Sequence, residues 1–590
     1  MFIATHAAQV RKLRRSAMYS WFSEREQMSA GGNPVFMPLL RSLLRLRVVV
    51  SKNMSLLAEL DLSAARLIDV TCMARSRSRI PFARARAKPL LPLFSLILAL
   101  FATGLSVQAE KVPFAMAYQL ATNICSQCHL FAEPSLLDRA TWRDKVKPLM
   151  RSTMGLAAIE SDPSPNSRIL IKEWNAIWDD YYLVAAPEQM PRQDPRPPIV
   201  PDLALFKVED PRYQVTNCFA TMIHIDTNAH QIYVGNGITK TLDVLDSAGR
   251  VLSSTPVDST LVHLLRQTNG WIGTQIGFVP PNDMPLGRVT FYEKKSDRFE
   301  KRFDLLTNLV RPVHTSVAEL EKPGVEDLVV CSFGNIAGRM SWYAPLDSGK
   351  FSEHTLVERP GSLLSRIVDI DRDGKPDIVV LTAQGREGIF LYRNQGNGQF
   401  VERPLIQEPP AWGSVYFEFA DFNGDGYPDI LTANGDLGDF VCPPKKYHGV
   451  RIYLNDGNWN FKESWFFPLN GAFKAVAADF DGDGDLDIAA ISYFPDYDRS
   501  PEESFVFLEN TGTTSRLEFK PHTFRDSARG RWLTMDVGDV DGDGDLDIVL
   551  GGAYLVPFRA PETLKDRWHN SGPSILILRN QLTERGRKSN

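Results

Sequence analysis

Residues 369–377 read Asp369-Ile-Asp371-Arg-Asp373-Gly374-Lys-Pro-Asp377 and run directly into the apolar stretch Ile378-Val-Val. The pattern returns three times, at steps of 52, 58 and 60 residues, and apolar residues follow each copy. Apolar runs that begin after Gly- and Asp-rich turns are typical of β-strands. A strand-containing unit repeated about every 50 residues is typical of a propeller blade. The other copies are Asp421-Phe-Asn423-Gly-Asp425-Gly426-Tyr-Pro-Asp429, Asp479-Phe-Asp481-Gly-Asp483-Gly484-Asp-Leu-Asp487 and Asp539-Val-Asp541-Gly-Asp543-Gly544-Asp-Leu-Asp547.

The rhythm continues upstream of these four segments. A weaker copy, Glu319-Leu-Glu321-Lys-Pro323-Gly324-Val-Glu-Asp327, lies 50 residues before the first, and strand pairs near 219–245 and 262–293 precede it. Units of about 54 residues divide 203–582 into seven. We therefore predict an all-β propeller of about seven blades over 203–582, followed by a polar tail at 583–590.

The four acidic segments predict calcium-binding loops. Carboxylates or an amide stand at loop positions 1, 3, 5 and 9, and a glycine that permits a sharp bend stands at position 6. The alternative is a set of solvated acidic turns, but four copies in register argue against it. The weaker copy has Pro323 at position 5, so we expect no metal there. The predicted Ca²⁺ ligands, for about four ions, are Asp369, Asp371, Asp373, Asp377, Asp421, Asn423, Asp425, Asp429, Asp479, Asp481, Asp483, Asp487, Asp539, Asp541, Asp543 and Asp547.

Charge is distributed unevenly along the chain. The formal net charge of the 590 residues is -5, yet residues 1–109 hold 16 Lys and Arg against 5 Asp and Glu. Residues 110–590 therefore carry a net charge of -16. Nucleic-acid binding depends on neutralising phosphates with positive charge, so we expect no nucleic-acid partner.

The basic front end predicts export. A basic stretch over 75–88 precedes an apolar run over 90–105 and then Val107-Gln108-Ala109. This order is that of a secretory signal, here 73–109, with cleavage after Ala109. A membrane anchor is the alternative, although the run is short for a spanning helix. We expect Met73 to be the natural start, with 1–72 a spurious extension, and a periplasmic or extracellular protein that meets the membrane only through its transient signal.

The segment Cys125-Ser-Gln-Cys128-His129 predicts covalent attachment of one haem c. Two thiols three positions apart can each bond a haem vinyl group, and the adjacent imidazole can bind the iron. A redox dithiol and half a zinc site are the alternatives; no second pair of zinc ligands follows, and the flanks are helical. Residues 110–186 are thus expected to form a small all-α cytochrome c domain, joined to the propeller by a Pro-rich linker over 187–202. Met150, Met154 and Met190 are candidates for the sixth iron ligand.

A further group of residues precedes the repeats by about five positions and is expected near the propeller axis. A basic, aromatic-lined funnel there would bind an anionic substrate or an acidic redox partner. The alternative is ordinary surface loops. The residues are His263, His314, Arg366, Trp412, Lys474, Arg531 and Trp532.

The cysteine motif and the acidic loops together resemble exported bacterial proteins that fuse a c-type cytochrome to an FG-GAP/VCBS propeller. The resemblance is strongest over about 370–550, where strands rather than EF-hand helices follow the loops. In that family pattern the methionine after Pro148-Leu149 looks like the usual iron ligand, which favours Met150 over Met154.

This resemblance implies electron transfer by the haem, while the propeller binds a redox partner, a surface polymer or an oxidisable substrate. A second hypothesis is a haem-dependent dehydrogenase with its substrate on the propeller axis. A third is an integrin-like adhesion propeller. The sequence contains no GxSxG, Walker or HExxH pattern, and we assign no catalytic residue.

Overall fold

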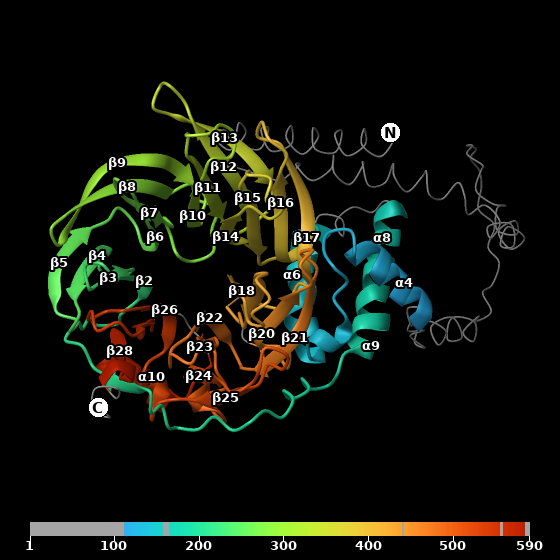
Figure 1. Cartoon of the computed structure of the whole chain (residues 1–590). Helices are drawn as coiled ribbons and strands as arrows, with labels where there is room; N and C mark the ends of the chain where they lie inside the picture. The colour runs from blue at the N-terminus through green and yellow to red at the C-terminus, as the bar shows by residue number, and fades with distance from the viewer. Residues whose placement is uncertain (1–110, 157–164, 439–441, 555–558, 585–590) are drawn as a thin grey trace, which may run out of the picture. The chain divides into compact units, whose positions relative to one another are not determined.

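The structure, a computed structural model, describes residues 111–156, 165–438, 442–554 and 559–584 (Figure 1). The expected extension 1–72, the expected signal peptide 73–109 and all but two residues of the tail 583–590 lie outside the described residues. The chain divides into two compact units, one containing Pro148–Asn175 and the other Pro113–Lys147 with Ala176–Asn590. Within the described ranges, every helix is too short or too polar to cross a bilayer.

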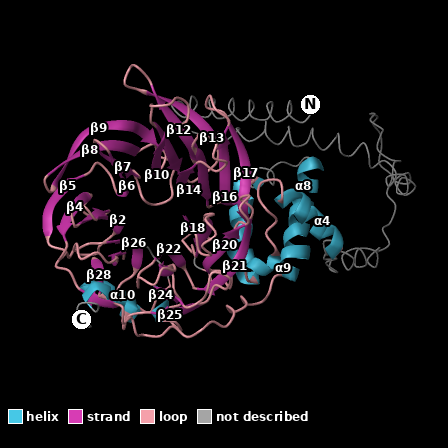
Figure 2. Ribbon diagram, in the orientation of Figure 1, coloured by secondary structure: helices cyan, strands magenta, loops and turns pink. Residues whose placement is uncertain are grey.

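Seven four-stranded antiparallel sheets form the propeller, which confirms the predicted number of blades. The first strand of each blade lies nearest the centre of the ring, and the next strands follow outward (Figures 1 and 2). The first four blades comprise β2 (Ala220–Asp226), β3 (Gln231–Asn236), β4 (Thr241–Asp246) and β5 (Val251–Pro256); β6 (Leu261–Gln267), β7 (Gly270–Gln275), β8 (Gly287–Lys295) and β9 (Arg298–Leu309); β10 (Pro312–Ala318), β11 (Asp327–Ser332), β12 (Arg339–Pro345) and β13 (Phe351–Val357); and β14 (Ser362–Val368), β15 (Asp377–Thr382), β16 (Glu387–Asn394) and β17 (Phe400–Glu408).

The last three blades complete the ring, and the seventh takes its outer strand from the start of the propeller sequence. β1 pairs with β28, with Phe206 opposite Asn580, so strands from both ends of the domain share one sheet. This pairing ties the ends together and leaves no open gap between the first and last blades. The strands are β18 (Ser414–Ala420), β19 (Asp429–Asn434), β20 (Gly449–Asn455) and β21 (Phe461–Pro468); β22 (Ala472–Ala478), β23 (Asp487–Ser492), β24 (Phe505–Asn510) and β25 (Phe519–His522); and β26 (Trp532–Gly538), β27 (Asp547–Gly552), β28 (Ile575–Asn580) and β1 (Phe206–Glu209).

The second strand of each blade explains the apolar runs that follow the acidic segments. Every residue of β15, β19, β23 and β27 is buried. A strand covered on both faces by neighbouring blades needs side chains such as Ile, Val, Leu and Ala on both sides. Each acidic segment therefore connects an inner strand to a buried second strand, as predicted.

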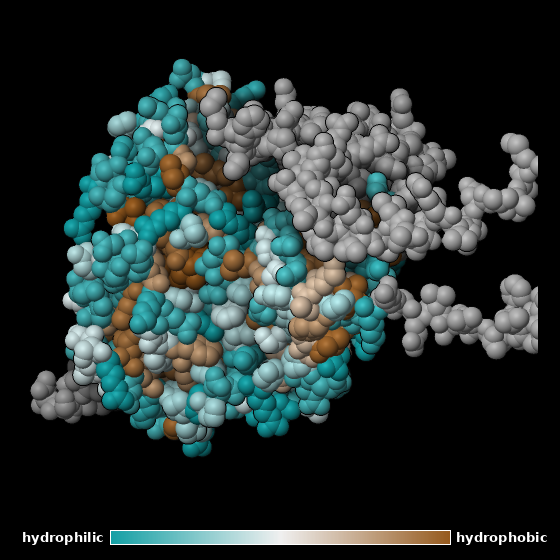
Figure 3. Space-filling view, turned by 90° about the vertical axis from the view of Figure 1, so that its right-hand side faces the viewer, coloured by the Kyte–Doolittle hydropathy of each residue, from teal (hydrophilic) through white to brown (hydrophobic). Residues whose placement is uncertain are grey.

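The face of the described chain in Figure 3 is largely hydrophilic, with smaller hydrophobic areas between.

Helices occupy the region that precedes the propeller, as the sequence predicted. Helical residues run without a break from Pro165 to Ala185. Asp138 caps the short helix α5, because its carboxylate accepts hydrogen bonds from the backbone N–H and the hydroxyl of Thr141 at 2.9 and 2.6 Å. The elements are α4 (Phe114–Cys125), η1 (Pro134–Leu136), α5 (Arg139–Thr141), η2 (Trp142–Val146), α6 (Lys147–Thr153), α8 (Pro165–Asn175), η3 (Ala176–Tyr182) and α9 (Leu183–Ala185), with η4 (Pro501–Ser504), η5 (Ser527–Arg529) and α10 (Glu562–Ser571) inside the propeller sequence.

The Pro-rich segment 187–202 lies along the outside of the propeller rather than spanning free solvent (Figure 1). Val200 exchanges backbone hydrogen bonds with the sixth blade, donating to Pro521 at 3.0 Å and accepting from Thr523 at 2.9 Å. Arg196 forms an ion pair of 2.7 Å with Glu503, whose side chain is 1% exposed. Burial raises the pKa of Glu503 to about 7, although Arg196 opposes the shift.

We expect Arg196→Met to destabilise the propeller more at pH 8 than at pH 6. A carboxyl whose pKa rises on folding stabilises the folded state at low pH. This contribution is lost as pH increases from the pKa of the group in the unfolded chain, about 4.3, through its pKa in the folded protein. Without Arg196 the buried charge has no cation partner, and the free energy of unfolding should fall by about 3 kcal/mol at pH 8. Urea unfolding at both pH values measures this. In the matched variant Arg196→Met/Glu503→Gln most of the lost free energy of unfolding should be regained. If Arg196→Met lost the same free energy of unfolding at both pH values, the prediction would be contradicted.

Candidate functional site

The acidic loops share one hydrogen-bonded frame, built on the aspartate at position 1. In each loop this carboxylate accepts the backbone N–H of the glycine at position 6, at 2.9, 2.8, 3.1 and 3.2 Å along the chain. The glycines at position 6 have φ between +81° and +97°, a conformation that other residues rarely adopt. The four loops therefore fold alike because their Asp and Gly residues recur in register.

The aspartate at position 9 opens the second strand and is almost completely buried. One oxygen of Asp487 accepts the N–H of Phe480 at 3.3 Å, and the other accepts the N–H of Asn510 at 2.8 Å. Burial, followed by the charges of nearby aspartates, raises the pKa of Asp487 to about 7 and that of Asp485 to about 6. A nearby cation would relieve this cost of holding several carboxylates together.

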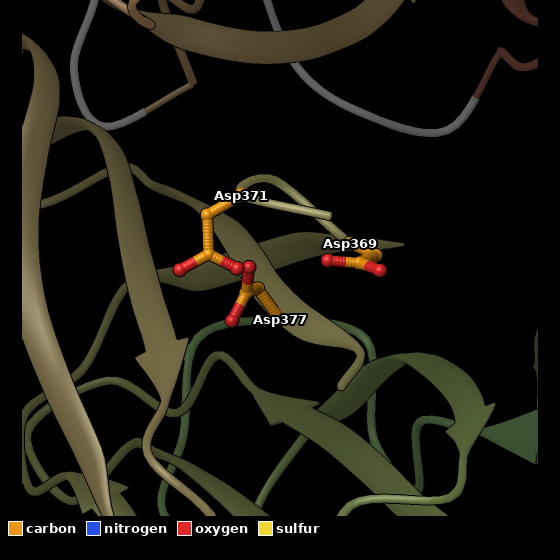
Figure 4. Close-up of side chains that lie close together, drawn as sticks. All are labelled: Asp369, Asp371 and Asp377. Carbon is orange, nitrogen blue, oxygen red and sulfur yellow. The ribbon is translucent and has the colours of Figure 1, made fainter. Parts of the chain in front are cut away.

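Three of the loops gather carboxylates closely enough to share one ion. The groups Asp369/Asp371/Asp377, Asp479/Asp481/Asp483 and Asp539/Asp541/Asp543 each have ligand oxygens within 4.8 Å of one another. In Figure 4 the carboxylates of Asp371 and Asp377 face each other and that of Asp369 lies beside them. In the remaining loop, Asn423 donates its side-chain N–H to Asp425 at 2.9 Å. Clustered hard oxygens suit Ca²⁺, so the donor set fits the predicted ion.

One position that the sequence analysis missed distinguishes the four loops. The residue before the last asparagine of each third strand is Arg393, Leu454, Glu509 or Arg579. Arg579 lies 2.9 Å from Asp547 and 3.3 Å from Asp541, and Arg393 lies 3.6 Å from Asp371. The arginines thus neutralise part of the acidic charge in two loops, whereas Leu454 and Glu509 add no positive charge to the other two.

The weaker copy keeps the frame but not the carboxylate cluster. Glu319 accepts the N–H of Gly324 at 2.8 Å, and Asp327 accepts those of Leu320 and Glu321 at 2.9 and 3.2 Å. The third blade therefore shows that this turn folds with Pro323 in place of the acid at position 5.

The cysteine motif follows directly from α4. Cys125 is the last residue of this helix, and no disulfide joins it or Cys128 to another described cysteine. His129 has its Nδ1 2.7 Å from the carbonyl oxygen of Leu130. An Nδ1–H that donates to this oxygen leaves Nε2 as the acceptor, which is the atom a histidine iron ligand needs.

Aromatic side chains surround the motif. α4 packs on η3 through Phe114 and Tyr118, whose rings lie 5.3 and 5.4 Å from that of Tyr181, and Trp142 lies 4.7 Å from Tyr182. Several apolar side chains nevertheless face solvent, with exposed fractions between 38% and 56%: Phe114, Met116, Tyr118 and Leu130. A bound porphyrin would cover apolar surface of this kind, so the residues fit the group.

Two of the three candidate sixth ligands, Met150 and Met154, belong to the other compact unit, whereas Met190 belongs to the unit of the cysteine motif. Met150 lies in α6, and Met154 follows that helix and donates its backbone N–H to Met150 at 2.9 Å. The preference for Met150 as the iron ligand stays a prediction.

The structure places five of the seven predicted axial residues on inner strands; the fifth, Trp532, is the first residue of β26. His263, His314 and Lys474 are the third residues of their strands, and Arg366 is the fifth of its strand. The rings of His263 and His314 lie 4.1 Å apart. Neither the proposed funnel of seven residues nor the alternative of surface loops describes this arrangement.

Trp532 and Arg531 were wrongly assigned to the funnel. Both are 0% exposed: Trp532 packs in the hydrophobic core, and Arg531 lies 3.7 Å above the ring of Tyr493. Trp412 stacks on Tyr447 at 4.6 Å and lies under Arg451. The prediction counted positions from the acidic loops, but β26 begins only at Trp532, where its first residue points into the core.

Comparisons with known proteins support the repeats. The family model described as FG-GAP-like repeat matches residues 369–432 and 437–490. Cartilage acidic protein 1 of Xenopus tropicalis is 26% identical over 352 residues, covering 50% of this chain and 49% of that protein. The mouse protein of the same name is 29% identical over 192 residues, covering 30% and 28%. The chain thus spans half or less of the length of these curated relatives.

Solved structures with a similar arrangement share little sequence with this chain. Sqt1 of Saccharomyces cerevisiae has a TM-score of 0.39 and 9% identity, covering 63% of this chain and 97% of its own. The N-terminal domain of Nup159 has a TM-score of 0.37 and 10% identity, covering 66% and 98%. The family match and the seven sheets show that the chain contains FG-GAP-like repeats within a seven-bladed β-propeller.

Proposed function

We propose that this chain is an exported binding protein whose propeller is stabilised by calcium. The observation that carries the proposal is the recurrence of one acidic loop frame in four consecutive blades, with the carboxylates gathered within 4.8 Å in three of them. The integrin-like alternative from the sequence, a propeller that presents a binding surface, agrees best with the repeat family that matches. Calcium is plentiful outside the cytoplasm, where loading of such loops stabilises the folded state by mass action.

The residues that would hold calcium are those at loop positions 1, 3, 5 and 9. Positions 3 and 5 supply exposed or half-buried side chains, while positions 1 and 9 are already fixed by backbone N–H groups. Fixed ligands lose little conformational entropy when an ion binds. The loops therefore suit a structural ion that holds an inner strand to the second strand of the same blade.

The proposal predicts unequal affinities among the four loops. We expect the loop of Asp539–Asp547 to bind Ca²⁺ most weakly, because Arg579 already engages two of its carboxylates. Arg579→Met should strengthen binding there about tenfold, or about 1.4 kcal/mol. Calorimetric calcium titration of the folded variant measures this. The control Arg302→Met removes a cation from β9 of a blade without acidic loops, and it should leave the titration unchanged; an unchanged Arg579→Met titration would contradict the expectation.

A second candidate function is electron transfer by a covalently bound haem c. The observation that favours it is Cys125-Ser-Gln-Cys128-His129 at the end of α4, with His129 oriented by the Leu130 carbonyl. Thioether bonds would form at Cys125 and Cys128, and His129 would bind the iron through Nε2, with Met150 or Met154 as the sixth ligand. When bound, the group supplies one-electron chemistry, and the exposed apolar side chains of Phe114, Met116, Tyr118 and Leu130 would pack against it.

The partner would be a redox protein or an oxidisable substrate, such as an organic anion, outside the cytoplasm. A haem-dependent dehydrogenase stays the enzymatic form of this proposal. One experiment separates the two candidate functions: binding of the full chain to extracellular polymers and to donor proteins is compared with that of Cys125→Ser/Cys128→Ser. Binding that persists in the variant supports a binding propeller, whereas reduction of the wild type by a donor protein or a small molecule supports electron transfer.

A further inference from the structure

The axis of the propeller is lined by one residue from each inner strand, the fifth in the strand. All seven are half-buried, although they lie on the innermost strand of their blades. Because the neighbouring blades cover the faces of these strands, solvent reaches them along the axis, around which the inner strands are arranged in Figure 1. The residues are His224, Leu265, Ser316, Arg366, Glu418, Val476 and Asp536.

The two acids of this ring are engaged by the backbone of the next blade. Glu418 accepts the N–H of Ala477 at 2.6 Å and the hydroxyl of Tyr416 at 2.7 Å. Asp536 accepts the N–H of Ile225 at 2.8 Å, across the junction between the seventh and first blades. These carboxylates therefore hold blades together, and their oxygens are directed at protein donors.

Lys474, the third residue of β22, is engaged in a similar way. Its ammonium donates to the carbonyl of Met535 at 2.7 Å in the seventh blade. Burial lowers its pKa, with Asp536 and Glu418 opposing the shift. Among the described residues, its other two protons have no hydrogen-bond acceptor. The ammonium can therefore also donate to a bound ligand.

Arg366 differs from these groups. Among the described residues it has neither a hydrogen-bond acceptor nor an ion-pair partner. Its guanidinium lies 6.0 Å from the ring centre of Tyr416 and 5.8 Å from that of Phe417, and the Glu418 carboxylate attracts it without forming a hydrogen bond or an ion pair within 4.0 Å. Five N–H donors in a planar fork suit the two oxygens of a carboxylate or the face of a tetrahedral oxyanion.

The two stacked histidines add neutral donors near Arg366. Burial, then Arg366, lowers the pKa of His263 to about 3, and burial also lowers that of His314. His314 Nδ1 lies 3.2 Å from the hydroxyl of Ser365, the neighbour of Arg366. His263 Nδ1 is buried and has no hydrogen-bond partner within the described part of the chain. A buried imidazole nitrogen without a hydrogen-bond partner is costly unless a ligand satisfies it.

We propose that the propeller axis binds a small oxyanion, a carboxylate or a tetrahedral anion, on Arg366, with His263 and Lys474 as supporting donors. The site lies on the inner strands, apart from the acidic loops and from the cysteine motif. It gives the propeller a small-ligand site in addition to its proposed binding role. Its occupant would accept hydrogen bonds from the Arg366 guanidinium, for which the described residues provide no acceptor.

The test is isothermal titration of the calcium-loaded full chain with acetate and, separately, with sulfate. Neither probe removes calcium from the loops as citrate or phosphate would. We expect the wild type to bind at least one probe, and Arg366→Gln to lose at least tenfold in affinity. Preference for acetate identifies a carboxylate site, and preference for sulfate a tetrahedral-anion site.

The matched control is Arg302→Gln, which removes an exposed arginine paired with Glu293 on the outer strand β9. It should bind both probes as the wild type does. Circular dichroism and calcium titration of Arg366→Gln verify that the propeller is intact, and His263→Gln, which retains a side-chain donor, should weaken binding less. A wild type that binds neither probe, or a folded Arg366→Gln that binds like the control, overturns the proposal.

Discussion

Removal of calcium from the full chain is expected to lower its melting temperature by more than 10 °C. A site at a ligand concentration 100 times its Kd stabilises the folded state by about 2.7 kcal/mol, so four sites contribute on the order of 10 kcal/mol. That is comparable to the whole free energy of unfolding of a typical domain. Without the ion, each loop holds several carboxylates near one another, and burial and mutual repulsion already raise the pKa of Asp481, Asp485 and Asp487.

Thermal unfolding with saturating calcium and with excess EGTA measures this effect. Asp481→Asn, at position 3 of the loop that has neither an arginine nor an amide ligand, should abolish about a quarter of the calcium-dependent shift. The matched control is Glu321→Gln, at position 3 of the weaker copy, which should leave the shift unchanged. Equal melting temperatures with and without EGTA would falsify the calcium assignment.

The repeat made the propeller predictable from the sequence. Each acidic loop stands at the same point of its blade, because position 9 always begins a strand buried on both faces and position 6 always needs the conformation of glycine. Even the weaker copy at 319–327 keeps an acid at position 1, Glu319, and the aspartate at position 9, Asp327, which build the hydrogen-bonded frame. Local sequence and tertiary packing therefore impose the same pattern, and periodicity alone reveals it.

Ring closure could not be predicted in the same way. β1 has only four residues, Phe206–Glu209, and its partner β28 lies some 370 residues later in the chain. No local feature of Phe206–Glu209 distinguishes an outer strand of the last blade from the first strand of a new one. The pairing is determined by where the seventh sheet leaves an unpaired edge.

The sequence predicted the cations of the axis but not its acids, because the predicted funnel was basic and aromatic. Glu418 and Asp536 went unnoticed, although the structure uses both to bond adjacent blades. The sequence analysis missed Arg579 because the two arginines do not recur at a fixed spacing. The separation between Asp547 and Arg579 along the chain differs from the separation between Asp377 and Arg393, because the connections between the second and third strands differ in length. A recurring Asn at the end of an apolar third strand (Asn394, Asn455, Asn510 and Asn580) was the available signal.

The second large effect is expected from the cysteine motif. Protein matured in a host with haem-attachment machinery should show the absorption bands of c-type haem, and the haem should stay with the polypeptide after denaturation. Cys125→Ser/Cys128→Ser should lose all of the covalently bound haem, because both thioether sulfurs are gone. Cys442→Ser, which removes a half-buried thiol elsewhere in the chain, should retain the wild-type spectrum.

The haem-free variant should also be more sensitive to proteases within 111–186. Phe114, Met116, Tyr118 and Leu130 would stay exposed without the porphyrin, and a helical segment this small buries too little apolar surface to be stable alone. The propeller, which is held by its own seven sheets, should keep its calcium-dependent melting transition in the same variant. Colourless wild-type protein whose Cys125 and Cys128 both react with an alkylating agent would show that the motif carries no haem, and would leave the binding propeller as the function.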